Sequence, residues 1–273
     1  MVIRLKFISA AAILSLLTVT GPAKSAEISV PSRIGGAGKL VFCTELAFPP
    51  WEMLDAQTQQ PTGFDVDFAA AVAKQMGVKS EHKNIAFDGL IPALQAGQCD
   101  AIISGLYDKP ARREVVDFVH YAFTGNSIFV KANSDIKLSA FDDLSGKKVS
   151  VGVGTGPEAD LKAANERLKA AGKPEIQIVS MPSTADAIQQ LTAGLVEAYA
   201  GSTDQGGYFD KQQPGQIRLA SPQVSALPVG IATLHKDKDL HEAFASAVAE
   251  VRKSGEYEAL LKKWGLESIE LKQ

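Results

Sequence analysis

The chain has 273 residues, of which 45% are hydrophobic, 22% charged and 7% aromatic, and its formal charge at pH 7 is −3. These proportions predict a globular protein with a sizeable core, and they exclude a disordered chain or a coiled coil. The slightly acidic balance argues against nucleic-acid binding, which requires a basic face. The only cysteines, Cys43 and Cys99, are too few for a disulfide-rich scaffold or for a zinc site of four thiolates.

The segment 1–25 has the pattern of a secretory signal peptide. Arg4 and Lys6 precede the apolar run 7–19, and a Gly-Pro pair and small residues follow it up to Ser25. The run is too short to cross a bilayer as a helix. We therefore expect cleavage after residue 25 and export of the mature chain to the periplasm.

Strands and helices are expected to alternate in the rest of the chain. The apolar run 39–44 predicts a strand, and the spacing of apolar residues over 65–76 predicts a helix with acids in its first turn. Asp88 is expected to cap a short helix that precedes a strand at 99–104. This alternation is typical of an α/β fold, in which parallel strands are joined by crossover helices.

A glycine-rich turn follows the strand predicted at 147–153. Its glycines at 152, 154 and 156 lack the G-x-G-x-x-G spacing of a dinucleotide loop, and a helix is predicted from Gly156 to Ala171. The segment is either a tight turn or a turn whose N–H groups hold a carboxylate at the start of a helix. The four histidines are scattered without ligand spacing, so we expect no metal site, no catalytic motif and no cofactor.

A helix–glycine–strand unit occurs twice in the chain. It predicts two α/β lobes of the same topology, with Ser104-Gly105 and Gly201-Ser202 at equivalent strand ends. Ligands of open α/β sheets lie at such ends, so we expect both lobes to face a shared cleft. The residues repeated at one constant offset are Ile91, Leu94, Ala96, Gly97 and Ala101, which match Ile188, Leu191, Ala193, Gly194 and Ala198, with Asp100 and Glu197 as corresponding acids.

Three side chains near predicted strand ends are candidates for a binding site. Arg112 either grips a ligand carboxylate or forms a surface ion pair with Glu114 or Asp117. Phe48 and Phe87 are either core residues or a stacking pair around that arginine.

Several motifs, taken in order along residues 38–266, resemble those of the bacterial family 3 extracellular solute-binding proteins, the polar amino-acid receptors of ABC transporters. The resemblance implies a two-lobe periplasmic-binding-protein fold of type II, in which each lobe is a sheet flanked by helices and two hinge crossovers let the lobes close on a ligand. The motifs are Gly63-Phe64-Asp65-Val66-Asp67-Phe68, the segments 87–94 and 99–105, Asp117-Phe118 and Lys263-Trp264-Gly265.

The same resemblance implies the domain organisation and the function. Lobe one is expected at about 26–122 with 230–273, lobe two at about 126–225, and the crossovers near 121–125 and 225–229. The protein is then a monomeric, non-enzymatic receptor for an amino acid or an amino-acid derivative. Its partner is the membrane permease of an ABC importer.

Roles for cleft residues also follow from the resemblance. Phe48 and Phe87 are implied to sandwich the ligand, while Arg112 grips its α-carboxylate. Thr155 and Gly156 are implied to donate to the same carboxylate from lobe two.

Four further residues are placed at the cleft by their match to the family motifs. Ser104 and Gly105 are implied to supply a hydroxyl and a backbone N–H. Glu45 occupies a position from which an acid can meet a ligand cation. Tyr107 replaces a small hydroxyl residue that is common in relatives, which leaves its orientation open.

Ser202 is the main departure from the family pattern, because receptors of free α-amino acids usually carry an aspartate there to pair with the α-ammonium. A serine cannot offset the burial of a cation. Either Asp204 takes the ammonium, or the ligand is a larger conjugate, such as an opine-like compound; we favour the conjugate.

Two questions stay open at this point. The same fold hosts periplasmic cyclohexadienyl dehydratases, and Glu45 is the obvious acid for such an alternative enzyme. Cys43 and Cys99 are expected on neighbouring strands of lobe one, where export permits a disulfide but a parallel register can hold them apart.

Overall fold

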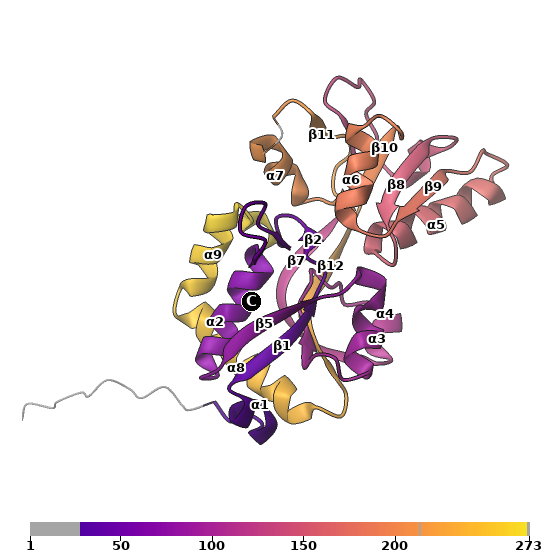
Figure 1. Ribbon diagram of the computed structural model, residues 1–273. Helices are drawn as coiled ribbons and strands as arrows, with labels where there is room; N and C mark the ends of the chain where they lie inside the picture. The colour runs from indigo at the N-terminus through magenta and orange to yellow at the C-terminus, as the bar shows by residue number, and fades with distance from the viewer. Residues whose placement is uncertain (1–27, 213, 272–273) are drawn as a thin grey trace, which may run out of the picture.

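The computed structural model describes residues 28–212 and 214–271, so the predicted signal peptide at 1–25 lies outside the described residues. The chain forms two lobes, one above the other (Figure 1). Lobe one, the lower in the figure, holds the first strands and the last helices of the chain, and lobe two holds the middle of the chain. Within those ranges, no helix is both long and apolar enough to span a membrane.

One curled sheet runs through both lobes, with the strand order β5-β1-β6-β12-β7-β10-β8-β9 and with β11 paired to β7. Its central pair, β7 (Val116–Lys131) and β12 (Ser225–Leu234), is antiparallel and passes from lobe one into lobe two (Figure 1). The segments predicted as crossovers therefore lie within two continuous, hydrogen-bonded strands. The strands approach closely at Gly125, where an added Cβ would stand 1.5 Å from the carbonyl oxygen of Ser225, so only glycine fits.

Lobe one packs helices on both faces of its part of the sheet. Successive strand residues point to opposite faces, so Phe42 packs with the α2, α8 and α9 side and Cys43 with the α3 side. The elements of this lobe are β1 (Lys39–Thr44), β5 (Lys79–Asn84), β6 (Ala101–Ile102), α1 (Ser32–Ala37), α2 (Phe64–Gln75), η1 (Phe87–Gly89), α3 (Leu90–Gln95), α4 (Pro110–Arg113), α8 (Lys238–Lys253), α9 (Glu256–Trp264), η3 (Glu267–Ile269), and a small sheet of β2 (Ala47–Phe48), β3 (Glu52–Leu54) and β4 (Pro61–Thr62).

Lobe two repeats this arrangement with a core on each side of its strands. Val151 and Leu161 belong to one core, and Phe129 and Leu191 to the other. The elements are β8 (Lys148–Gly152), β9 (Gln177–Met181), β10 (Ala198–Ser202), β11 (Ile217–Leu219), η2 (Phe141–Leu144), α5 (Gly156–Ala170), α6 (Thr184–Thr192) and α7 (Gln205–Gln212).

The internal repeat is confirmed in the structure. In lobe one, Asp100 accepts the N–H of Val41 at 2.9 Å, which joins the turn after α3 to β1. In lobe two, Glu197 accepts the N–H of Lys148 at 3.1 Å and joins the turn after α6 to β8 in the same way. The matching acids therefore hold equivalent strand–turn junctions, which accounts for their recurrence.

Two sequence predictions in lobe one are wrong in detail. Asp88 caps no helix; it lies inside the 3-10 turn η1, and no side chain caps α3. The strand predicted at 99–104 is limited to Ala101–Ile102, because Cys99 and Asp100 form the turn that leads into it. Strand β1 has the predicted bounds, and helix α2 begins and ends one residue earlier than predicted.

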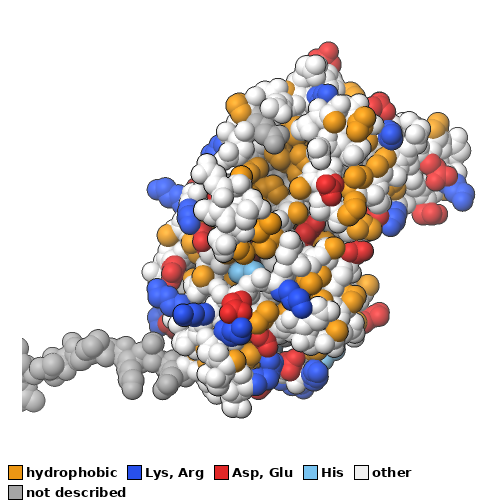
Figure 2. Space-filling view, in the orientation of Figure 1, with side chains coloured by type: hydrophobic (Ala, Val, Ile, Leu, Met, Phe, Trp, Pro, Cys, Tyr) orange, Lys and Arg blue, Asp and Glu red, His pale blue; other side chains and the backbone are white. Residues whose placement is uncertain are grey.

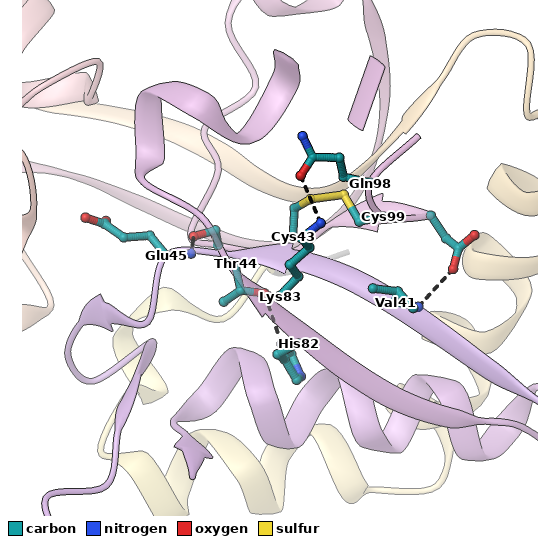
Figure 3. The surroundings of a disulfide bond; sticks show 10 residues. Val41, Cys43, Thr44, Glu45, His82, Lys83, Gln98 and Cys99 are labelled. Atoms are coloured by element: carbon teal, nitrogen blue, oxygen red, sulfur yellow. Dashed lines mark hydrogen bonds between the residues drawn. A yellow bond between two sulfur atoms is a disulfide. The ribbon is translucent and has the colours of Figure 1, made fainter. Parts of the chain in front are cut away.

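Cys43 and Cys99 form a disulfide, with their Cα atoms 5.6 Å apart (Figure 3). Cys43 lies on β1, but Cys99 lies in the turn before β6, so only one of them is on a strand as predicted. The parallel register pairs Cys43 with Ile102. The parallel register does not hold the two cysteines apart, because the N–H of Asp100 donates to the carbonyl of Val41 and brings the turn back beside β1.

Candidate functional site

A cavity lies between the two lobes, at the carboxyl ends of their strands. It contains about 410 Å³ of space that no protein atom fills, part of it open to solvent. Its walls include nine of the residues predicted from the sequence: Glu45, Phe48, Phe87, Gly105, Tyr107, Arg112, Thr155, Gly156 and Ser202.

Arg112 is the cation of this cavity. It lies on α4, with its guanidinium carbon 5.4 Å from the centre of the Phe87 ring. Its Nη1 donates to the carbonyl of Tyr107 at 2.7 Å, and its Nη2 donates to the carbonyl of Gly154 in lobe two at 3.3 Å. Burial lowers the pKa of Arg112 to about 10, so the group stays charged at neutral pH. Since a guanidinium has five N–H donors, it can still donate to a carboxylate.

The alternative surface ion pair of Arg112 is wrong. Asp117 instead pairs with His235, at 3.0 Å. Among the described residues, no ion pair joins Arg112 to Glu114 or to Asp117.

Glu45 is the anion of the cavity, one residue beyond β1 (Figure 3), and its residue surface is 2% exposed. One carboxylate oxygen, Oε1, accepts the N–H of Thr184 from lobe two at 3.2 Å. The other, Oε2, is buried without a hydrogen-bond partner among the described residues. Burial, together with repulsion from Asp186 and Asp88, raises the pKa of Glu45 to about 7. An unpartnered carboxylate oxygen at the cavity is suited to a cationic group.

Tyr107 points into the cavity and fills space that Gly156 leaves free. A Cβ on Gly156 would stand 2.6 Å from the Tyr107 ring, so the two residues fit only as a pair. The Tyr107 hydroxyl donates to Ser202 Oγ at 3.3 Å. Burial raises the pKa of this phenol above its ordinary value, so the phenol stays neutral.

Thr155 and Gly156 form the start of α5 at the cavity wall. Thr155 is the N-cap: its Oγ1 accepts the N–H of Glu158 at 3.4 Å and donates to the carbonyl of Gly152 at 2.7 Å. Helix N-termini attract anions because their first N–H groups have no partner within the helix. The glycine-rich segment is therefore a turn that presents a helix start to the cavity.

The expected roles of Ser104 and Gly105 do not fit the geometry. Ser104 Oγ accepts the N–H of Glu45 at 2.9 Å and donates to Glu52 at 2.7 Å, and this side chain lies behind the cavity wall. The N–H of Gly105 donates to Asp65 at 2.7 Å. Both donors are already used within the protein. What Gly105 provides is space, since a Cβ there would stand 2.6 Å from the Phe48 ring.

Asp204 also lies outside the cavity wall. Its Oδ1 accepts hydrogen bonds from Thr124 at 2.6 Å and from Ser202, and its Oδ2 accepts the indole N–H of Trp51 at 2.5 Å. Burial raises the pKa of Asp204, while these donors oppose the rise. Both carboxylate oxygens are thus occupied by protein groups from both lobes.

Some wall residues were not among the predicted site residues. Gly152 and Gly201 lie in motifs that the sequence did reveal, but Thr184 and Tyr199 carry no such signal. Tyr199 is a buried strand residue whose hydroxyl donates to Gln205 at 2.9 Å. The complete set of additional wall residues is Gly152, Pro157, Thr184, Tyr199, Ala200 and Gly201.

Acidic and basic side chains are interspersed on the face of the molecule shown in Figure 2. In the part of the chain that the structure describes, no three His, Cys, Asp or Glu side chains are grouped so that they could hold a metal ion.

Residues 40–267 match the family described as bacterial extracellular solute-binding proteins, family 3. The putative ABC transporter arginine-binding protein 2 of Escherichia coli is 30% identical over 227 residues, which is 82% of this chain and 89% of that protein. The holo ArgBP of T. maritima superposes with a TM-score of 0.72 at 31% identity, over 86% of this chain and 100% of that one. The ancestral amino acid-binding protein AncCDT-1, a precursor of cyclohexadienyl dehydratase, superposes with a TM-score of 0.76 at 31% identity, over 85% and 98%. The chain therefore belongs to the bacterial extracellular solute-binding proteins of family 3.

Proposed function

We propose that this protein captures an amino acid or an amino-acid derivative between its two lobes and delivers it to the membrane permease of an ABC importer. The observation that carries the proposal is the interlobe cavity, whose walls include the guanidinium of Arg112 and a carboxyl oxygen, Glu45 Oε2, that has no hydrogen-bond partner among the described residues. The relative from Escherichia coli is named for arginine binding. A ligand with a carboxylate and a basic group is accordingly the first candidate.

The ligand is proposed to lie with its carboxylate between Arg112 and the start of α5. Thr155 and Gly156 contribute the N-terminus of that helix, which favours an anion. A basic group at the other end of the ligand reaches Glu45. The rings of Phe48 and Phe87 cover the apolar middle of the molecule.

Closure of the lobes is proposed to bring these groups together. Lobe one is about 26–122 with 230–273, lobe two is about 126–225, and the hinge is the part of β7 and β12 between them. Two contacts of cavity residues already join the lobes: Arg112 to the Gly154 carbonyl, and Glu45 to the Thr184 N–H. Because Arg112 and Glu45 both belong to lobe one, a ligand stabilises the same closed arrangement through its carboxylate, which also meets the start of α5 in lobe two.

The segment 1–25 is proposed to direct export and to be cleaved, which leaves a monomeric receptor in the periplasm. N-terminal sequencing of protein recovered from the periplasm of an expressing bacterium tests this directly. A mature chain that starts near Ala26 supports the proposal, and retention of Met1 contradicts it.

Thermal-shift screening followed by calorimetric titration tests the binding function. A ligand that binds only the folded state raises stability by RT ln(1 + [L]/Kd), or about 2.7 kcal/mol at a hundredfold excess over Kd. The screen covers the common amino acids, opines and basic carboxylic acids, and mass spectrometry of denatured protein identifies any co-purified ligand. The proposal fails if no compound binds and no ligand is released.

A dehydratase is the second candidate, because the raised pKa of Glu45 would also suit a general acid in a cleft. The likeness to AncCDT-1 supports the same test. Incubation with prephenate would yield phenylpyruvate, water and carbon dioxide if the protein were such an enzyme. We expect no phenylpyruvate above the level given by Glu45→Gln protein.

A further inference from the structure

The cavity holds one cation and one anion. Among the described residues that line it, Arg112 is the one basic side chain and Glu45 the one carboxylic acid. The remaining walls are aromatic rings, hydroxyls, small side chains and a proline. A buried ligand must therefore find its counter-charges at these two residues.

The carboxylate end of the cavity is well defined. Arg112 donates to the carbonyl of Tyr107, and the ring of Tyr107 lies against Gly156 at the start of α5. Ser202 adjoins the same place, since its Oγ accepts from the Tyr107 hydroxyl at 3.3 Å. In the proposed pose, the carbon atom next to a carboxylate held by Arg112 lies near Tyr107 and Ser202.

No carboxylate lines the cavity at that place. The hydroxyl proton of Ser202 is directed to Asp204, and Tyr107 directs its own proton to Ser202. Asp204 stands behind Ser202 with both oxygens occupied by Trp51, Thr124 and Ser202. An ammonium group on that carbon would lose its water and would meet hydroxyl groups in place of a carboxylate as its direct partners, which is costly for a buried cation.

We infer that the cavity selects carboxylic acids that carry one cationic group at the far end and no charged nitrogen on the carbon next to the carboxylate. Such a ligand balances Arg112 with its carboxylate and Glu45 with its cation, and it leaves Tyr107 and Ser202 against an uncharged carbon. The class comprises ω-guanidino and ω-amino acids, and basic amino acids whose α-nitrogen is acylated. The inference rests on the proposed binding function and narrows its ligand.

Matched pairs of probes test the inference by calorimetric titration. L-Arginine is compared with 5-guanidinopentanoate, which lacks only the α-ammonium group, and L-lysine is compared with 6-aminohexanoate in the same way. We expect the probe without the α-ammonium group to bind at least tenfold more tightly in the pair that binds. Equal or tighter binding of the α-amino acid overturns the inference. If none of the four binds while another carboxylic acid does, the inference is overturned and the binding function stands; if no carboxylic acid in the screen binds, the binding function itself fails.

Exchange of Ser202 supplies a second test. Ser202→Asp places a carboxylate at the uncharged end, so it should shift the ratio of affinities toward L-arginine by at least tenfold. Ser202→Asn is the control of similar size without the charge, and its ratio should stay within threefold of the wild-type value. An unchanged ratio in a folded aspartate variant contradicts the inference, and the wild-type comparison decides the matter where that variant does not fold.

Discussion

Asp204 of lobe two accepts the indole N–H of Trp51 of lobe one at 2.5 Å. The two residues are 153 positions apart in the chain, and both are buried. Asp204 also accepts from Thr124 on β7, near the passage between the lobes. One carboxylate thus joins lobe one, the shared strand pair and lobe two.

Replacement of Trp51 by Phe is expected to favour the open form. The indole donor is lost, and a hydrogen bond to a charged group contributes about 1.5–3 kcal/mol. We expect weaker ligand binding and a larger radius of gyration in small-angle scattering of the ligand-free protein. Phe64→Leu is the matched control, because Phe64 packs edge-on against Trp51 within lobe one, so its exchange should lower the melting temperature alone. Wild-type scattering and affinity in the Trp51 variant would contradict the role of this link.

The close contact between Tyr107 and Gly156 predicts that substitutions at these two positions have strongly coupled effects on ligand binding. Gly156→Ala alone should weaken ligand binding at least tenfold, because the new methyl group would stand 2.6 Å from the Tyr107 ring. In the background of Tyr107→Ser the same change should have little effect, since the ring is gone. A double-mutant cycle by calorimetry should give a coupling of at least about 1 kcal/mol. Additive effects would show that the ring and the glycine do not constrain one another.

Glu45 predicts a stability that falls as the pH rises. Burial raises its pKa from 4.5 to about 7 in the folded chain, so between these values the folded protein keeps a proton that the unfolded chain has lost. Stability from this group is complete below about pH 4.5 and declines up to about pH 7, by roughly 3 kcal/mol at most. Glu45→Gln retains an acceptor for the Thr184 N–H and cannot titrate.

The difference in free energy of unfolding between Glu45→Gln and wild type isolates this contribution. Other buried groups, such as Asp65 with a pKa raised by burial to about 7 and His82 with a pKa lowered by burial to about 4, titrate in both proteins. In urea denaturation of the ligand-free proteins, the free energy of unfolding of the variant should increase relative to that of wild type as the pH rises from 5 to 8. A difference that does not change with pH would mean that Glu45 is ionised throughout.

The disulfide between Cys43 and Cys99 predicts a stability effect confined to lobe one. Exchange of both cysteines for alanine should lower the free energy of unfolding by about 2–4 kcal/mol, since the bond closes a long loop in the unfolded chain. Ligand affinity should change by less than threefold, because neither residue lines the cavity. Thiol labelling of denatured, unreduced protein should find no reactive thiol, and two labelled cysteines would rule out the bond.

Local sequence signals predicted the elements well. Strand β1 and helix α2 have periodic apolar residues and clear ends, and their bounds agree with the prediction to within one residue. The repeat was visible because Gly97 and Gly194 both adopt a positive φ after a short helix, which favours glycine in each unit. The same periodicity did not predict that Asp88 lies inside a 3-10 turn.

The details of the site that the sequence did not predict depend on hydrogen bonds between residues far apart in the chain. Ser104 lies two residues beyond the end of β6, and Glu52 and the Glu45 N–H occupy its hydroxyl. Asp204 lies outside the cavity wall, and Trp51 and Thr124 donate to its two carboxylate oxygens. Such contacts arise only when segments far apart in the chain come together, so no local pattern predicts them.

The affinity of Arg112→Ala protein tests the central claim that the interlobe cavity binds a carboxylate ligand. Calorimetric titration uses L-arginine and 5-guanidinopentanoate, with the surface variant Arg167→Ala as control, since Arg167 pairs with Asp142 in lobe two and is not in the cavity wall. Loss of the cation leaves the carboxylate without its partner, so we expect a decrease in affinity of at least thirtyfold, or about 2 kcal/mol. Binding of the better probe within threefold of the wild-type value would contradict the account.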